Sequence, residues 1–394
     1  MADNVVVTGL GVISPIGCDE QSFWEALVQG RSGAAPVDCL DTSDLPRRIA
    51  CQVKEPVQTG RALGRASQLA VVASRQALTS ASLDLSATDD ARVAVLVGTT
   101  MGETEFIEER LGATDADWLS PEHMKRIVTG MPGSIAGSVA ADMGVEGPAV
   151  DLYGACAAGN LAIASARRRL LAGECDIALA GGADGFSRLA FIGFMRLRVM
   201  AAEVCRPFDE QRDGLLVGEG AAMFVLERES SARARGAPLR ARVAGASVTC
   251  EDYHPTRPHP DGEGLSRATR EALRSAGMEA TDIDYVCAHG TGTPQNDAIE
   301  AKVMHNCFPH GVSFSSIKAL TGHTMGAAAA MEAACCVLSL QHQMLIPTWH
   351  LRKVLQPCSL DAIQREPRST RVVRVVNNSA GFGGYNSSVI LVAA

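Results

Sequence analysis

Short runs of apolar residues alternate along the chain with longer segments in which apolar residues recur at helical spacing. The strands predicted from the short runs cover residues 4–8, 92–97, 149–152, 176–180, 223–227, 240–247, 285–288, 312–315, 371–376 and 388–392. The helices predicted from the longer segments cover residues 21–28, 67–78, 134–143, 157–171, 265–276, 297–306 and 326–341. This alternation is typical of layered α/β folds. Strands that are apolar throughout, such as RVAVLV at 92–97, indicate a sheet buried on both faces.

The polar stretch 228–236 separates two series of predicted elements. At about 150 residues per domain, 394 residues correspond to two or three domains or to one closely duplicated unit. No low-complexity linker interrupts the chain, so we predict two tightly packed halves, residues 1–236 and 237–394. The 38 glycines exceed the usual ~7% and predict a core with close backbone contacts.

Composition limits the functions that such a fold can carry. The net charge of −8 argues against a protein that binds nucleic acid or an anionic membrane through its overall charge. Twelve cysteines without a CxxC pair indicate reduced thiols, a cytoplasmic protein and no metal site. The N-terminus lacks the basic region of a signal peptide, and the apolar run 326–340 is too short and too weakly hydrophobic to cross a membrane.

Cys156 lies in the segment DLYGACAAGN, after a predicted strand and before a predicted helix. The positive end of a helix dipole stabilises a thiolate, so this position predicts a nucleophile whose pKa lies below that of a free cysteine, ~8.5. The small residues around it leave room for a substrate. The alternative is that Cys156 is one more buried cysteine.

Two histidines are further candidates for catalysis. His289 ends a predicted strand and enters the loop HGTGTP, at the edge where α/β sheets place their ligands. His323 lies in KALTGHTMGA, five residues after Lys318. The alternative for each histidine is a structural role. Lys318 lies in an apolar setting and needs a partner, which Asp297 and Glu300 on one helix face could supply. The alternative is that Lys318 takes part only in an ordinary surface salt bridge.

The segment NSAGFGGYN at 378–386 is rich in glycine. Such a backbone can direct N–H groups at an oxyanion, although a tight turn between two strands explains it equally well. A phosphate-binding loop is disfavoured, because neither a Walker pattern nor GxGxxG after a strand is present.

Five motifs occur together in one order: GACAAG, CRPFDEQRDGLLVGEG, AHGTGTPQND, SSIKALTGHTMGAA and NSAGFGGYN. With them the chain resembles, over essentially its whole length, the β-ketoacyl–acyl carrier protein synthases of the type I/II condensing-enzyme family. Related type III enzymes use Cys/His/Asn, and thiolases need a second cysteine in the C-terminal glycine loop, which this chain lacks. Chain-length factors of aromatic polyketide systems lack the nucleophile, whereas Cys156 is present.

The resemblance implies a thiolase-like αβαβα layered fold with two pseudo-duplicated halves. It implies a decarboxylative Claisen condensation of an acyl thioester with malonyl-acyl carrier protein, giving a β-ketoacyl-acyl carrier protein in fatty acid or, by preference, type II polyketide biosynthesis. The substrates are expected on the phosphopantetheine of an acyl carrier protein, with no bound cofactor. The expected assembly is a homodimer or a heterodimer with a chain-length factor. The alternative function is a non-catalytic partner subunit of such a heterodimer.

The resemblance also implies residue roles. Cys156 carries the acyl group, while His289 and His323 bind the malonyl thioester carbonyl and stabilise the enolate. Lys318 tunes the histidines, and the backbone N–H groups of Cys156 and Phe382 form an oxyanion hole. The other implied positions are the gate and acyl pocket (Phe382, Ile107, Ala380, Tyr385), the pantetheine contacts (Thr291, Thr293), supporting residues (Glu300, Asp297, Asn386) and carrier-protein docking residues (Arg61, Arg65, Lys125, Arg126, Arg198).

The chain departs from the family pattern around the expected acyl pocket. Gly154 replaces a usual Thr, Ala380 a usual Phe and Tyr385 a small or polar residue, and the connection 200–206 is shorter. These departures favour a specialised pathway, such as a polyene or other highly reduced polyketide. A Tyr385 hydroxyl in the pocket predicts a preference for unsaturated or functionalised acyl chains, unless Tyr385 only packs beneath the loop.

Overall fold

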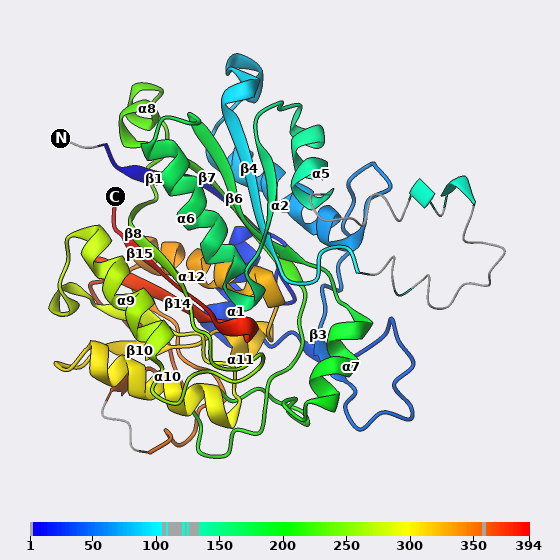
Figure 1. Cartoon of the computed structure of the whole chain (residues 1–394), viewed down its shortest axis with the longest axis vertical. Helices are drawn as coiled ribbons and strands as arrows, with labels where there is room; N and C mark the ends of the chain where they lie inside the picture. The colour runs from blue at the N-terminus through cyan, green and yellow to red at the C-terminus, as the bar shows by residue number, and fades with distance from the viewer. Residues whose placement is uncertain (1–2, 105–107, 109–119, 123, 126–133, 357–359) are drawn as a thin grey trace.

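A computed structural model describes residues 3–104, 108, 120–122, 124–125, 134–356 and 360–394 (Figure 1). In these residues one eleven-stranded sheet has the order β12-β10-β9-β14-β15-β8-β1-β7-β6-β4-β5. Its strands are β1 (Val5–Ile13), β4 (Val93–Thr99), β5 (Ala149–Tyr153), β6 (Ile177–Asp184), β7 (Gly220–Arg228), β8 (Ala241–Cys250), β9 (Tyr285–Cys287), β10 (Ser313–Ser315), β12 (Asp361–Ala362), β14 (Arg374–Ala380) and β15 (Tyr385–Val392). Two small two-stranded sheets pair β2 (Ala34–Pro36) with β3 (Ile49–Cys51) and β11 (Met344–Leu345) with β13 (Arg368–Ser369).

The strand order repeats within the sheet. The series β5-β4-β6-β7-β1 and β10-β9-β14-β15-β8 have the same order, and in each the first two pairings are parallel and the last two antiparallel. The two series meet where β1 pairs with β8. The α/β fold with pseudo-duplicated halves is therefore confirmed. The stretch chosen as their boundary holds the short helix α8 (Glu229–Ala234), and the division at residue 236 stays a prediction.

Helices form three layers around the two halves of the sheet. The described helices, besides α8, are α1 (Glu20–Gln29), α2 (Arg65–Ser80), α5 (Ser134–Met143), α6 (Ala158–Leu171), α7 (Arg188–Arg196), α9 (Glu263–Ala276), α10 (Pro294–Cys307), α11 (Lys318–Thr321) and α12 (Ala328–His342). Helices α2 and α5 pack on the first half, and α9, with α10 beside it, packs on the second. Helices α6 and α12 contact each other and lie between the two halves, giving αβαβα layers.

Most of the apolar run 326–340 forms the central helix α12. All its residues from Ala328 to Leu340 are buried, because both half-sheets and α6 surround it. A helix that is apolar all round belongs in such a core. Among the described residues, no helix combines the length and the hydropathy needed to cross a membrane.

Helices α6 and α12 cross at Gly159, and this contact yields a stability prediction. A Cβ at Gly159 would lie 2.6 Å from the backbone nitrogen of Ala330, so Gly159→Ala must push the helices apart. We expect it to lower the free energy of unfolding by about 1–3 kcal/mol, measured by chemical denaturation. Gly137→Ala in α5 is the matched control, because nothing lies within 4 Å of its added Cβ. Equal stability of the wild type and Gly159→Ala would contradict the expected crowding.

Candidate active site

Cys156 lies in a 3-10 turn, Ala155–Ala157, between the end of β5 and the start of α6. The preceding Ala155 has φ +47°, a left-handed conformation that is uncommon for a residue with a side chain. This sharp turn places the thiol at the end of the parallel strands. The sulfur of Cys156 and one ring nitrogen each of His289 and His323 all lie within 4.8 Å of one another, and all three residues are buried.

Burial controls the ionisation of Cys156. It raises the pKa of the thiol to about 11, although the Lys318 charge and the backbone N–H of Phe382 act in the opposite direction. The sequence predicted a pKa below that of a free cysteine, and this prediction was wrong. The helix N-terminus was identified correctly, but the depth at which the turn is buried outweighs the stabilisation of a thiolate there. The resting nucleophile is therefore a thiol.

His289 follows β9, and both its backbone and its ring nitrogen Nδ1 have hydrogen-bonding partners. Its backbone N–H donates to Glu300 at 2.7 Å, and its Nδ1 lies 3.2 Å from Lys318 Nζ and 3.3 Å from Ser379 Oγ. An ammonium group can only donate, so Nδ1 accepts from Lys318. In a neutral imidazole the proton is then on Nε2.

His323 presents the same tautomer for a different reason. The backbone N–H of Met325 donates to its Nδ1 at 3.2 Å, which places the proton on Nε2. The rings of His289 and His323 lie 5.4 Å apart and nearly perpendicular. Burial and the Lys318 charge lower the pKa of both rings well below the usual value. The site therefore holds two neutral imidazoles, each with Nε2–H as its remaining donor.

The thiol and the two imidazoles form a set of soft ligands that zinc accepts elsewhere. These hydrogen bonds do not suit a metal. Coordination through Nε2 would move the His323 proton to Nδ1, where it would face the N–H of Met325, which cannot accept it. Coordination through Nδ1 would displace the N–H of Met325 or the ammonium of Lys318. The cluster fits hydrogen-bond donation better than metal binding.

The carboxylate partner of Lys318 is Glu332 on α12. The sequence offered Asp297 and Glu300, and the structure corrects that choice. Glu300 accepts the N–H groups of His289 and Gly290, while Asp297 accepts N–H groups of the same loop. Both acids thus fix the loop that carries His289, and Lys318 donates to the His289 carbonyl oxygen at 2.6 Å and to Glu332.

The glycine-rich segment passes directly over the nucleophile. A Cβ at Gly381 would lie 3.0 Å from the backbone nitrogen of Cys156, so a larger residue would crowd that N–H. Hydrogen bonds from the backbone N–H groups of Phe382 and of Cys156 itself lower the pKa of the thiol, against the larger effect of burial. Two backbone donors therefore approach the sulfur from different segments. The Phe382 ring packs against Phe194 of α7 with centroids 5.6 Å apart.

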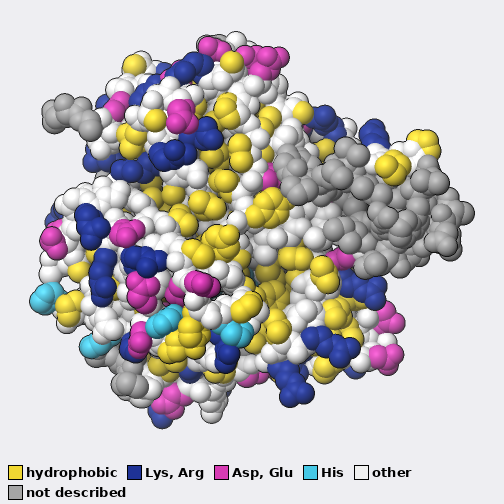
Figure 2. Space-filling view, in the orientation of Figure 1, with side chains coloured by type: hydrophobic (Ala, Val, Ile, Leu, Met, Phe, Trp, Pro, Cys, Tyr) yellow, Lys and Arg dark blue, Asp and Glu magenta, His cyan; other side chains and the backbone are white. Residues whose placement is uncertain are grey.

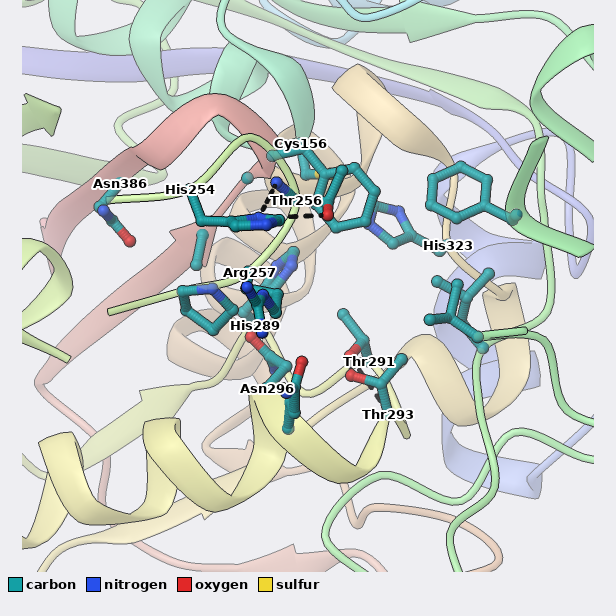
Figure 3. Close-up of a pocket in the computed structure, with 18 of the residues that line it drawn as sticks. Cys156, His254, Thr256, Arg257, His289, Thr291, Thr293, Asn296, His323 and Asn386 are labelled. Carbon is teal, nitrogen blue, oxygen red and sulfur yellow. Dashed lines mark hydrogen bonds between the residues drawn. The ribbon is translucent and has the colours of Figure 1, made fainter. Parts of the chain in front are cut away.

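A pocket with a cavity volume of about 260 Å³ opens onto these groups (Figure 3). Thr291 and Thr293 line it just before α10, and their hydroxyl oxygens lie 2.9 Å apart. Its other lining residues include Cys156, His289, His323, Ala380, Phe382, Asn386, His254, Thr256, Arg257, Asn296, Phe194, Val199 and Leu215. Apolar residues from α7 and the following segments form one wall, and polar residues from the β8–α9 loop and the start of α10 form the other.

The structure does not place Tyr385 in this pocket. Its side chain is 37% exposed, whereas its neighbour Asn386 is buried and lines the cavity. Successive side chains of β15 point to opposite faces, so only one of the two can reach the pocket. The assignment of Tyr385 to the acyl pocket was wrong, and the substrate preference argued from its hydroxyl loses its basis.

The residues expected to dock a carrier protein differ in their surroundings. Arg61, Lys125 and Arg198 are exposed. Arg65 instead forms a two-point ion pair with the buried Glu219, at 2.9 and 3.0 Å, and its place in a docking surface stays a prediction. Figure 2 shows Lys and Arg side chains in several separate groups on this face. Two further predicted residues lie outside the described part of the chain, Ile107 of the acyl pocket and Arg126 of the docking surface.

Sequence reasoning missed three buried polar residues beside the site. Glu332 is an acid within the Ala-rich helix α12, a signal that could have identified it as the Lys318 partner. Asp184 accepts the N–H of Gly326 at 2.6 Å and fixes the turn after His323, and burial raises its pKa to about 6. Ser379 donates to the Cys156 carbonyl oxygen at 3.0 Å, and no pattern in the sequence indicates this contact.

Comparisons with known proteins agree with this geometry. Family models match residues 2–232 (β-ketoacyl synthase, N-terminal domain) and 240–352 (β-ketoacyl synthase, C-terminal domain). The chain is 34% identical to 3-oxoacyl-[acyl-carrier-protein] synthase 2 of Staphylococcus aureus (strain COL), over 98% of this chain and 97% of that protein. The solved ishigamide ketosynthase/chain length factor matches with TM-score 0.95 and 36% identity, covering 100% of both chains. A type II polyketide synthase acyl carrier protein in complex with its ketosynthase matches with TM-score 0.92 and 27% identity, also over 100% of both chains. The layered fold, the cysteine beside two histidines and the two family models together show that this chain belongs to the β-ketoacyl synthase family.

Proposed function

We propose that this chain catalyses the decarboxylative condensation of an acyl thioester with malonyl-acyl carrier protein, giving a β-ketoacyl-acyl carrier protein. The observation that carries the proposal is the pairing of one buried thiol with two neutral imidazoles, each with its Nδ1 occupied. A nucleophile and two fixed N–H donors at one pocket are what acyl transfer and enolate formation require.

The first half-reaction loads the nucleophile. The sulfur of Cys156 attacks the carbonyl carbon of the acyl thioester, and a new C–S bond forms as the bond to the pantetheine sulfur breaks. The thiol proton passes to the departing sulfur. The N–H groups of Cys156 and Phe382 stabilise the oxyanion formed during this exchange.

The second half-reaction forms the carbon–carbon bond. The malonyl thioester oxygen accepts from the Nε2–H groups of His289 and His323, which stabilise the enolate left when CO2 departs. The enolate carbon then attacks the acyl carbon on Cys156, and the C–S bond breaks to leave a thiolate, which takes a proton from water and becomes the resting thiol again. Neutral imidazoles suit this task, because they lose no proton to the enolate before the new bond forms. Lys318 holds His289 in the donor tautomer.

The substrates and partner follow from the same reasoning. The acyl and malonyl groups arrive on the phosphopantetheine of an acyl carrier protein, whose arm contacts Thr291 and Thr293, and no other cofactor takes part. Ala380, beside the gate Phe382, opens the pocket for a specialised, polyketide-type chain. The assembly is a homodimer or a heterodimer with a chain-length factor, as in the solved structure named for both subunits. The eleven described cysteines that are free thiols support a reducing, cytoplasmic setting.

A second candidate is a non-catalytic partner subunit of such a heterodimer. The similarity to a ketosynthase/chain length factor structure favours it, since both kinds of subunit share the fold. Cys156, with two donor histidines and a paired lysine, argues against it, because a subunit that only shapes a tunnel has no use for them.

One experiment separates the two candidates. The chain is incubated with an acyl-acyl carrier protein and its intact mass is measured. We expect a gain of one acyl group in the wild type and none in Cys156→Ala. Cys175→Ala is the matched control, because Cys175 is also buried but lies outside the pocket lining. No gain in the wild type would favour the non-catalytic subunit.

A further inference from the structure

Both histidines of the resting site hold their proton on Nε2, the nitrogen left for the pocket. This arrangement suits donation to an enolate but leaves neither ring able to accept a proton there. Acyl transfer nevertheless begins from a buried thiol whose pKa is raised to about 11. One of the two rings must change its tautomer for the thiol proton to leave through an imidazole.

The partners of Nδ1 decide which ring can change. At His323 the partner is the backbone N–H of Met325, which cannot accept a hydrogen bond. At His289, Nδ1 has a second partner in addition to the Lys318 ammonium. This partner is the hydroxyl oxygen of Ser379, which lies 3.3 Å from Nδ1. The hydroxyl hydrogen of Ser379 is directed at the Cys156 carbonyl oxygen, 3.0 Å away, so its oxygen lone pairs are available to Nδ1–H.

We infer that Ser379 is a positioning residue that allows His289 to change tautomer, serving as proton acceptor during acyl transfer and as hydrogen-bond donor during decarboxylation. His323 remains a donor throughout. The inference rests on the proposed transfer of an acyl group to Cys156. It assigns the two histidines different tasks, although both rings show the same tautomer at rest.

The surroundings of His289 permit this change. Lys318 does not depend on Nδ1, because its ammonium also donates to the His289 carbonyl oxygen and to Glu332. When Nδ1 carries the proton it donates to Ser379 Oγ, and the Nε2 lone pair then faces the pocket. In the transfer, the proton moves from Cys156 Sγ to Nε2 and from there to the departing pantetheine sulfur, so His289 ends neutral.

The test compares the pH dependence of Cys156 alkylation by iodoacetamide, followed by peptide mass spectrometry. In the wild type His289 takes the thiol proton, so the rate at pH 7 does not depend on prior ionisation. In Ser379→Ala the attack needs a thiolate formed beforehand, whose fraction rises tenfold per pH unit up to about pH 11. We expect the variant to be roughly 10- to 100-fold slower at pH 7 and the difference to shrink steadily toward pH 10.

The control is Ser387→Ala. Ser387 lies directly opposite Ser379 on β15 and is equally buried, and its hydroxyl has no hydrogen-bond partner in the described part of the chain. It should match the wild type at every pH. The other ionisable groups that face His289, Lys318 and Glu300 among them, are the same in all three proteins and cancel in the ratio of rates.

Two outcomes would overturn the inference. A rate ratio that stays constant from pH 7 to pH 10 would mean that Ser379 only places Cys156 through its carbonyl group. Equal alkylation rates of the wild type and Ser379→Ala at pH 7 would mean that Ser379 neither places Cys156 nor helps His289 to change tautomer. If Ser379→Ala does not fold, ¹⁵N NMR of the wild type decides, because the ring shifts of His289 must show an Nδ1-protonated fraction in exchange with the resting tautomer, and those of His323 must show none. Alkylation needs no carrier protein, so a failure of the proposed condensation would leave this result readable.

Discussion

Glu332→Ala is expected to lower the free energy of unfolding by about 3–5 kcal/mol. Glu332 and Lys318 are 1% exposed, and their ion pair lies between α11 and α12. Removing the carboxylate leaves an ammonium in the core with only the His289 carbonyl oxygen and Nδ1 to accept from it. Glu332 also holds Lys318 in the position from which it orients His289, so activity should fall together with stability. Chemical denaturation monitored by circular dichroism gives the stability change.

Two further variants show whether the loss comes from the unpaired charge. Glu332→Gln keeps an oxygen for Lys318 and should cost less than Glu332→Ala. Glu263→Ala removes the partner of an exposed i,i+4 ion pair with Arg267 on α9 and should cost under about 1 kcal/mol. If the Glu332→Ala loss were no larger than that of Glu263→Ala, the buried pair would not support the site.

His323→Ala is expected to slow malonyl decarboxylation by about 10²- to 10³-fold while leaving acylation of Cys156 close to wild type. Removing one fixed donor to a developing oxyanion has an effect of this size in other enzymes. Acyl transfer is spared because the backbone of Met325 keeps His323 a donor, so it takes no part in removing the thiol proton. Decarboxylation is measured as conversion of malonyl- to acetyl-acyl carrier protein, and acylation by intact mass.

His289→Ala is the informative comparison, since it should slow both half-reactions. His323→Gln should recover part of the decarboxylation, because its side-chain amide supplies an N–H donor at a similar reach. Wild-type decarboxylation by His323→Ala would remove this histidine from the enolate site. Slow acylation in His323→Ala would show that the two rings share the proton transfer.

Most of the layered fold could be predicted because its signals are local. The strand RVAVLV at 92–97 became β4, and the Ala-rich stretch from 326 became η5 (Met325–Ala327) and α12. Helix α7 was missed because residues 189–195 are apolar or glycine throughout, so no helical period of apolar and polar positions stands out. The pairing of β1 with β7 could not be predicted either, since it joins segments more than 200 residues apart.

The candidate site also has parts that local sequence predicts and parts that depend on how distant segments pack. Cys156, His289 and His323 stand at strand or helix ends that the sequence marks, and the structure brings them together. The partner of Lys318 could not be predicted, because it depends on how α12 passes beneath α11. Neighbouring side chains on β15 point to opposite faces, so Asn386 faces the pocket and Tyr385 does not. The sequence does not tell which of the two faces inward. The thiol pKa follows from burial depth, which no local pattern encodes.

The position of β1 has a consequence for synthesis of the chain. These nine residues, VVVTGLGVI, are buried throughout and leave the ribosome long before β7 and β8, which are their partners in the described sheet. Pairing over such a distance is slow, and an unpaired apolar strand promotes aggregation. A nascent chain that stops short of Arg228 carries this strand without a neighbour. Translational pauses before that point should therefore favour aggregation, and pauses after β8 should not.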